Sequence, residues 1–390
     1  MGVLREKMGE VVPFTLMVIM EGCTIGLTIL AKTAITGGMS PFVFVVYTNV
    51  IGSLLLLPFS FIFHRERTEQ SLLTFPLLVR IFFLGLTGIA VSQNLAFVGL
   101  SYSSPIVVCA MGLLTPSLSF LLSIIPRRTR PNWRSSSSQA EVTGTLISIM
   151  GAVVVELYKG PFIRKSSYFY AHQLKVIPKR LVFYSAPDNW ILGAILLAAA
   201  SLSVAIWNVI QLGTVKQYPQ VMKVASFYSL AGTIQCLVFS LIMERDLNAW
   251  KLKLNLELLL IVVTGVFGSI IRSNVHLACS RMKGPFYVPM FKPFGIVFAT
   301  FFGVTFTNSL HYGSFHFIPK VPASWSSNFL QISKSYSVIG TLITGMGYYA
   351  VMWGQIREEE LRKERDVERT DDSSDQIKAP LLQKQEEAQV

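Results

Sequence analysis

The sequence predicts an all-α, polytopic membrane protein of about ten transmembrane helices, arranged as an inverted repeat of two five-helix units. Three observations predict this class: charge is scarce, apolar runs of membrane-spanning length follow one another, and parts of the sequence recur. Of the 390 residues, 52% are hydrophobic and 14% are charged. A soluble domain has about 25% charged residues to cover its surface, so this composition excludes a soluble protein, and it equally excludes extensive disorder.

Each transmembrane helix needs about 20 apolar residues to cross a hydrocarbon core of about 30 Å. Ten segments meet this requirement, at 12–32, 41–63, 76–98, 103–125, 142–159, 190–213, 221–243, 256–279, 284–307 and 338–355. They divide the chain into an N-terminus, a first unit, a central loop, a second unit and a charged tail, at 1–11, 12–160, 161–189, 190–355 and 356–390.

Lys and Arg residues in the short loops predict the orientation, because cytoplasmic loops carry an excess of them. With both termini in the cytoplasm, more of these residues lie on the cytoplasmic side than on the outer side. The basic central loop contradicts this orientation, but longer loops constrain it less. We therefore expect a cytoplasmic N-terminus and a cytoplasmic tail.

The internal repeat is the most specific signal in the sequence. At a constant offset of 180, the third and eighth segments share the pairs Gly85 and Gly265, Gly88 and Gly268, Asn94 and Asn274, and Pro105 and Pro285. GTLISIMG at 144–151 also matches GTLITGMG at 340–347 in six of eight positions. Chance similarity between apolar helices is the alternative. Because five is odd, the second unit enters the membrane from the opposite side, which is typical of transporters.

Four segments carry a resemblance to a known family: QNLAFVGLSYSSP, LYKGP, MKGPFYVPMFKP and GYYAVMWGQ, at 93–105, 157–161, 282–293 and 347–355. As a set they resemble the plant EamA-type drug/metabolite transporter superfamily, and within it the walls-are-thin-related (UMAMIT) family. The resemblance implies two EamA-like units, a plasma-membrane location with the vacuolar membrane as the alternative, and transport of amino acids, auxin-like carboxylates or related metabolites.

The chain departs from the family pattern in two places. IPRRTRPNWR stands where the family commonly has an Arg-x-Glu-type motif, so no function is carried onto those positions. Residues 315–337 interrupt the approach to the last segment. They are either a retained intron or gene-model insertion, or a genuine outer loop.

No motif of an enzyme is present, because the sequence has neither a phosphate-binding P-loop nor a His-Glu-x-x-His pair. The four cysteines fall inside apolar runs, which predicts buried thiols rather than metal ligands or disulfides. We expect a protein that is not an enzyme, with no cofactor, no metal and no nucleic-acid partner. Its partners are a small-molecule solute and the lipid bilayer; proton coupling and the oligomeric state are left open.

Three charged side chains lie well inside predicted helices: Glu21, Arg272 and Lys292. Each costs about 2.5–3.5 kcal/mol to insert into a membrane and therefore usually faces a cavity or a partner. All three lie at similar depths from the cytoplasmic end, so they can form one polar layer with an uncompensated positive charge suited to a carboxylate. In the alternative, Glu21 pairs with one cation and the other extends to the cytoplasmic interface.

Residues near these charges extend the candidate site. His276 shares a helical face with Arg272, and is either a hydrogen-bonded interior residue or a proton relay. Pro289 and Pro293 predict a broken helix near Lys292. The uncharged candidates for solute binding are Gln93, Asn94, Asn208 and Asn274, followed by Asn49, Trp207 and Gln235.

Taken together, these features predict a secondary or facilitative transporter that moves small organic solutes by alternating access. The alternatives are a non-transporting membrane receptor or scaffold, or an inactive splice variant of the transporter.

Overall fold

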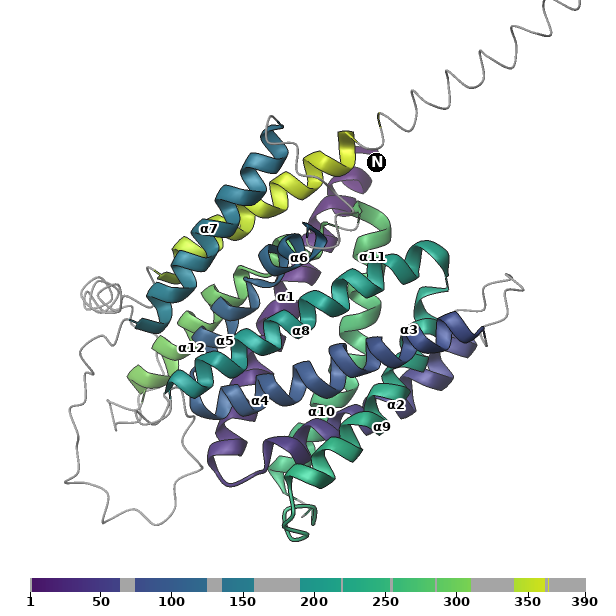
Figure 1. Cartoon of the computed structure of the whole chain (residues 1–390), viewed down its shortest axis with the longest axis vertical. Coiled ribbons are helices and arrows are strands. Elements are labelled where there is room, and N and C mark those ends of the chain that lie inside the picture. The colour runs from purple at the N-terminus through teal and green to yellow at the C-terminus, as the bar shows by residue number, and fades with distance from the viewer. Residues whose placement is uncertain are drawn as a thin grey trace, which may run out of the picture.

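A computed structural model describes residues 2–63, 74–124, 135–157, 190–218, 220–252, 255–284, 286–309, 340–361 and 364. Within these ranges all regular secondary structure is helical, and the helices form one bundle (Figure 1). The predicted central loop, the suspected insertion at 315–337 and most of the charged tail lie outside the described residues.

The first unit contains α1 (Gly2–Thr36), α2 (Pro41–Phe63), α3 (Phe75–Gly85), the π-helix η1 (Leu86–Val91), α4 (Ser92–Tyr102), α5 (Pro105–Gly112), α6 (Thr115–Ile124) and α7 (Ser136–Leu157). The second unit contains α8 (Trp190–Gln217), α9 (Val221–Met243), α10 (Leu256–Val266), the π-helix η3 (Phe267–Arg272), α11 (Ser273–Lys283), the 3-10 helix η4 (Pro289–Phe291) and α12 (Phe294–Ser309). A last helix covers residues 340–361.

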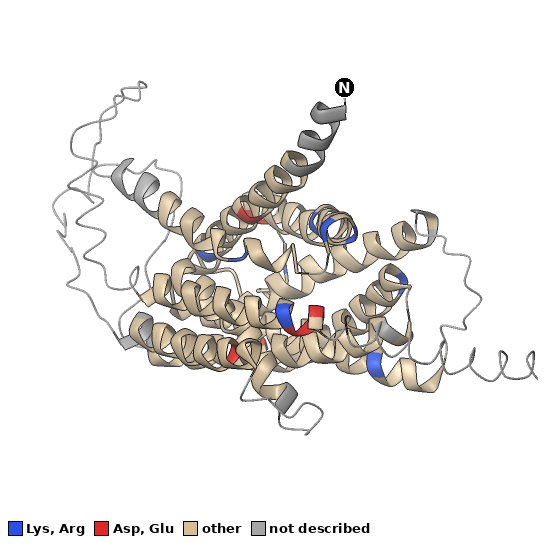
Figure 2. Cartoon of the chain, turned by 90° about the horizontal axis from the view of Figure 1, so that it is seen from above, with Lys and Arg blue, Asp and Glu red and all other residues tan. Residues whose placement is uncertain are grey.

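Each of the ten predicted segments coincides with helix, which confirms the predicted fold class. Among the described residues, seven helical segments are long and apolar enough to cross a membrane. The other three predicted segments correspond to α7, to η4 with α12, and to the last helix. Figure 2 shows how few Lys, Arg, Asp and Glu residues interrupt the helices.

Local sequence explains where several helices begin and end. Ser104 precedes Pro105 and accepts a hydrogen bond from the backbone N of Val107 at 3.4 Å, so it starts α5. Asn255 starts α10 in the same way, by accepting from the next turn. Gly284, with a φ of +99°, ends α11, because residues with a side chain rarely adopt this left-handed conformation.

The two units share an unusual local geometry. Each has a π-helix at the corresponding position, η1 in the first and η3 in the second. The repeated asparagines after them also make the same bond: Asn94 Nδ2 donates to the carbonyl of Ala90 at 2.7 Å, and Asn274 Nδ2 donates to that of Ile270 at 2.8 Å. Because π-helices are rare, their recurrence at matched positions supports the repeat more strongly than shared apolar residues do.

Glycines bring the two units together along equivalent contacts. A Cβ atom on Gly85 of α3 would lie 2.7 Å from the backbone N of Gly232 on α9. A Cβ atom on Gly265 of α10 would lie 2.9 Å from the carbonyl of Thr48 on α2. Gly52, beside Thr48 on α2, is the equivalent of Gly232 at the offset of 180. Only glycine permits this close approach of backbones, so the contacts of α3 with α9 and of α10 with α2 are copies of one another.

The two GTLI motifs pack directly against each other. A Cβ on Gly144 of α7 would lie 2.8 Å from the carbonyl of Gly347, and one on Gly151 would lie 2.8 Å from that of Gly340. The start of one motif therefore meets the end of the other, so α7 and the last helix are antiparallel neighbours (Figure 1). The first glycine of each motif contacts the last glycine of the other, which is the relation that a pseudo-two-fold axis between inverted repeats produces.

The first segment continues beyond residue 32, its predicted end, so that Lys32 lies inside a helix. Helix α1 continues to Thr36, and Lys32 is 1% exposed. Its ammonium donates to the carbonyl of Leu100 at 2.8 Å and to that of Ser101 at 2.7 Å. These carbonyls belong to the last turn of α4, whose negative helix end attracts a cation.

Candidate functional site

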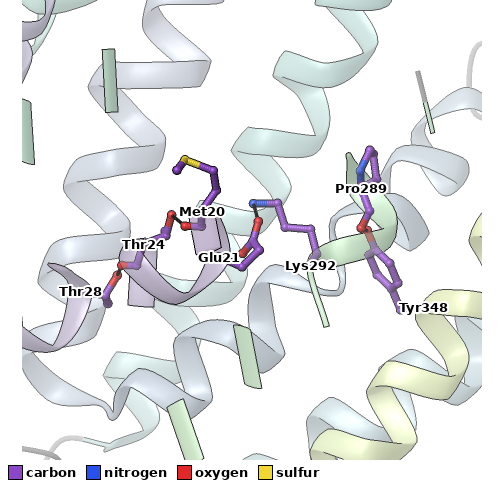
Figure 3. A network of polar contacts seen from close by, with 7 residues as sticks. All are labelled: Met20, Glu21, Thr24, Thr28, Pro289, Lys292 and Tyr348. Carbon is purple, nitrogen blue, oxygen red and sulfur yellow. Dashed lines mark hydrogen bonds and ion pairs between the residues drawn. The ribbon is translucent and has the colours of Figure 1, made fainter. Parts of the chain in front are cut away.

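Glu21 and Lys292 form an ion pair between the two units. Lys292 Nζ lies 3.4 Å from Glu21 Oε1, and the two side chains are 46% and 4% exposed. Glu21 projects from the middle of α1, and Lys292 follows η4 directly, so the pair joins the first unit to the second (Figure 3). Arg272 and Lys292 were the two possible partners of Glu21, and of these Lys292 lies within ion-pair distance.

The helix is broken at Lys292, as the prolines predicted. The backbone N of Lys292 donates to the carbonyl of Pro289 at 3.0 Å, and the carbonyl of Lys292 accepts from Gly295 at 3.1 Å. Both bonds span three residues instead of the four of an α-helix. Pro293 has no N–H and cannot donate to the carbonyl four residues before it. The break places the Lys292 side chain at the junction of η4 and α12.

The surface of α1 around Glu21 is closely packed and its hydroxyls are satisfied. A Cβ on Gly22 would lie 3.2 Å from the ring of Phe298 on α12. Thr24 donates to the carbonyl of Met20 at 2.7 Å (Figure 3). Glu21 is therefore the charged group that this part of α1 presents to the second unit.

Arg272 is the last residue of η3 and lies within electrostatic range of Glu21. Its Nη2 atom is 3.9 Å from the place of a Cβ on Gly268. Within the described part of the chain, its guanidinium forms no hydrogen bond and no ion pair within 4.0 Å. It is therefore a charged group held in the helix bundle without a direct protein partner.

His276 lies four residues after Arg272 and within electrostatic range of both Arg272 and Lys292. Its Nε2 atom is buried and has no hydrogen-bond partner among the described residues. We call Glu21, Arg272, His276 and Lys292 the charged cluster. It contains one carboxyl group, one guanidinium, one amine and an imidazole nitrogen that can accept or donate.

The predicted amides make their hydrogen bonds elsewhere. Asn94 donates to Ala90 in its own helix and to Cys236 Sγ at 3.1 Å on α9. Asn274 bonds within its own helix, and Gln93 Oε1 accepts from Asn49 Nδ2 at 2.6 Å. The bonds of Asn94 to Cys236 and of Gln93 to Asn49 join different helices. The amide of Asn208 forms no hydrogen bond within the ranges that the structure describes.

The remaining candidates, Trp207 and Gln235, also lie away from the charged cluster. Gln235 Nε2 donates to the carbonyl of Phe82 at 3.1 Å, a contact between α9 and α3. The indole N–H of Trp207 is buried without a partner among the described residues. Neither side chain bonds to a residue of the charged cluster.

Tyr348 and Cys109 lie near the charged cluster, but the charges and residue spacings of the sequence did not identify them as candidates. Tyr348 OH donates to the carbonyl of Pro289 at 2.6 Å and so ties the last helix to the break (Figure 3). Cys109 of α5 lies within electrostatic range of both Glu21 and Lys292. The only sequence signal for Tyr348 is its place in the GYYAVMWGQ segment.

Comparison with known proteins agrees with this geometry. The model of the EamA-like transporter family matches residues 14–157. The WAT1-related protein At1g70260 of Arabidopsis thaliana is 57% identical over 396 residues, covering 99% of this chain and 100% of the relative. The Arabidopsis WAT1-related protein At1g60050 is 53% identical over 390 residues and covers 98% of both chains. The chain therefore belongs to the WAT1-related proteins of the EamA-like transporter family, which are polytopic membrane transporters and not enzymes.

Proposed function

We propose that this transporter moves small organic carboxylates, such as amino acids and auxin-like acids, and that Arg272 and Lys292 bind the carboxylate group. Membership of the family supports a transporter of small solutes. The charged cluster supports the finer proposal, because it contains two cations and one carboxylate.

The observation that carries the proposal is that Arg272 has no hydrogen-bond partner among the described residues. Glu21 is paired with Lys292 at 3.4 Å, whereas Arg272 forms no hydrogen bond among the described residues. A cation inside a membrane protein is costly unless a partner neutralises it. A solute carboxylate would supply that partner, and guanidinium binds carboxylates through two parallel hydrogen bonds.

The position of the cluster suits alternating access. Glu21 belongs to the first unit, and Arg272 and Lys292 belong to the second. A solute held between them would contact both units at once, so rocking of one unit against the other would open the same site to each side in turn. The broken segment at Lys292 supplies irregular backbone of the kind that transporters place at binding sites.

We further propose that both termini lie in the cytoplasm and that the protein works in the plasma membrane, with the vacuolar membrane as the alternative. The N-terminal end of α1 and the end of the last helix lie at the same end of the bundle (Figure 1). An even number of spans requires this arrangement. The Lys and Arg residues of the short loops favour the cytoplasm for that end.

The test is uptake of labelled alanine, phenylalanine and indole-3-acetate into proteoliposomes that contain the full chain. We expect Arg272→Gln to lower uptake by about tenfold or more, since a hydrogen bond to a charged group contributes about 1.5–3 kcal/mol. Arg80→Gln is the matched control, because Arg80 donates to the carbonyl of Gly213, away from the cluster.

Normal uptake by both Arg272→Gln and Lys292→Gln would refute the carboxylate site. A wild-type protein that transports neutral solutes but no carboxylate would refute the substrate class. A wild type that transports nothing would favour a receptor or scaffold.

A further inference from the structure

The two units have equivalent glycines on their π-helices, but the space beside them differs. Gly88 lies on η1 and Gly268 lies on η3, and they correspond at the offset of 180. Gly88 faces Trp207 of α8, whereas a Cβ on Gly268 would meet only a side-chain atom of Arg272, in the same unit. The backbone geometry is thus repeated, whereas the side chains around it are not.

In the first unit the indole ring of Trp207 fills this space. A Cβ on Gly88 would lie 2.6 Å from Trp207 Nε1 and 3.0 Å from its Cγ. The ring also packs against Tyr228, with ring centroids 6.2 Å apart. The absent side chain of Gly88 therefore leaves a slot on η1 that holds a bicyclic aromatic group.

In the second unit the slot over Gly268 is unfilled. A Cβ on Gly268 would meet only Arg272 Nη2, at 3.9 Å, among the described residues. The residue at the position equivalent to Trp207 is Leu27, and no atom of it reaches within 4 Å. A bilayer-facing slot would expose the guanidinium to hydrocarbon, so the charge of Arg272 argues for a slot that faces the protein interior.

Unsatisfied polar atoms flank this slot. Thr264 lies one turn before Gly268, and its Oγ1 atom is buried without a hydrogen-bond partner. His276 lies one turn after Arg272, and its Nε2 atom is also buried without a hydrogen-bond partner. Buried polar atoms normally have partners, so two orphans on either side of an unpaired cation indicate that a polar ligand or ordered water completes the site.

We infer that the slot over Gly268 receives the side group of the transported carboxylate, and that Gly268 sets the size of the side group that is accepted. The inference rests on the proposed carboxylate transport. Arg272 binds the carboxylate at the mouth of the slot and the side group lies over Gly268. Because Trp207 fills the equivalent slot with an indole, the slot admits acids with aromatic side groups, whose ring faces also attract the guanidinium.

The test compares three carboxylates of increasing size in proteoliposomes that contain the full chain: alanine, phenylalanine and indole-3-acetate. We expect Gly268→Leu to raise the KM for phenylalanine and indole-3-acetate by about tenfold or more relative to alanine, as expected for a lost fit in an apolar pocket. Gly268→Ala should shift the ratio in the same direction by less. Gly213→Leu is the control, because a Cβ on Gly213 meets no atom within 4 Å and the residue lies on α8, outside the slot.

The outcomes separate the two proposals. A wild type that transports no carboxylate refutes the proposed function and this inference with it. Wild-type carboxylate transport with equal KM changes for all three solutes, or with none, in Gly268→Leu refutes the inference alone. If Gly268→Leu does not fold, as judged by thermal unfolding in detergent, Gly268→Ala decides: an unchanged KM ratio overturns the role of Gly268.

Discussion

The hydroxyl of Tyr348 donates a 2.6 Å hydrogen bond to the carbonyl of Pro289, the carbonyl that Pro293 cannot satisfy. In an α-helix the N–H four residues later would be the donor, and a proline at that position has none. The backbone N of Lys292 donates to the same carbonyl at 3.0 Å, and the last helix adds a second donor. Tyr349 OH donates to the next carbonyl, that of Met290, at 3.1 Å. Two side chains from another helix therefore stabilise the helix break next to Lys292.

Removing this donor should destabilise the break. Tyr348→Phe keeps the ring and leaves the carbonyl of Pro289 with its bond from the backbone N of Lys292, so the loss of one hydrogen bond should cost about 0.5–1.5 kcal/mol. We expect a lower thermal unfolding midpoint in detergent and a larger loss for Tyr348→Phe than for Tyr349→Phe, because Tyr349 is 40% exposed and Tyr348 is 2% exposed. Equal midpoints for both variants and the wild type would contradict the role of this bond.

The ion pair between Glu21 and Lys292 should show energetic coupling. Glu21→Gln leaves Lys292 and Arg272 without a counter-charge, and the double variant Glu21→Gln/Lys292→Gln removes part of that repulsion. Residues in direct contact typically couple by about 0.5–3 kcal/mol. A double-mutant cycle of unfolding midpoints should therefore be non-additive. Strict additivity of the two single effects would show that the pair contributes nothing to stability.

Lys32 should stabilise the fold without affecting solute selectivity. Lys32→Met removes the donor to the carbonyls of Leu100 and Ser101, and the loss of hydrogen bonds from a charged group costs about 1.5–3 kcal/mol. We expect a lower unfolding midpoint and an unchanged KM ratio between alanine and phenylalanine. Lys32→Arg, which retains a donor and a charge, should recover part of the midpoint. A changed KM ratio in Lys32→Met would place Lys32 at the solute path instead.

The contact between α7 and the last helix should tolerate no added methyl group. A Cβ on Gly151 would lie 2.8 Å from the carbonyl of Gly340, so Gly151→Ala must push the helices apart. Overpacking of this kind costs about 1–3 kcal/mol. Gly345→Ala is the matched control on the last helix, since a Cβ there meets nothing within 4 Å. Similar unfolding midpoints for Gly151→Ala and Gly345→Ala would mean that the helices can separate freely.

Much of the candidate site was predictable from the sequence, because intramembrane charge is rare and is recognised without knowledge of neighbours. Glu21, Arg272 and Lys292 stand out against apolar surroundings, and His276 follows from its spacing to Arg272. The amides are harder to assign from the sequence, because a polar residue in a membrane helix can bond within its own helix or to a neighbouring helix instead of binding a solute. Asn94 and Gln93 do so, and no property of the sequence distinguishes that use from solute binding.

The sequence by itself determined the ten helices, the duplication and the break at Lys292, because hydropathy, recurrence and proline chemistry are properties of the chain read in one dimension. The tertiary structure decided that Glu21 pairs with Lys292 and that Lys32 is buried against α4. It also decided that Trp207 fills the slot at Gly88 while the slot at Gly268 stays open. These outcomes depend on distances between helices that are far apart in the sequence, and such distances arise only when side chains of different helices pack together.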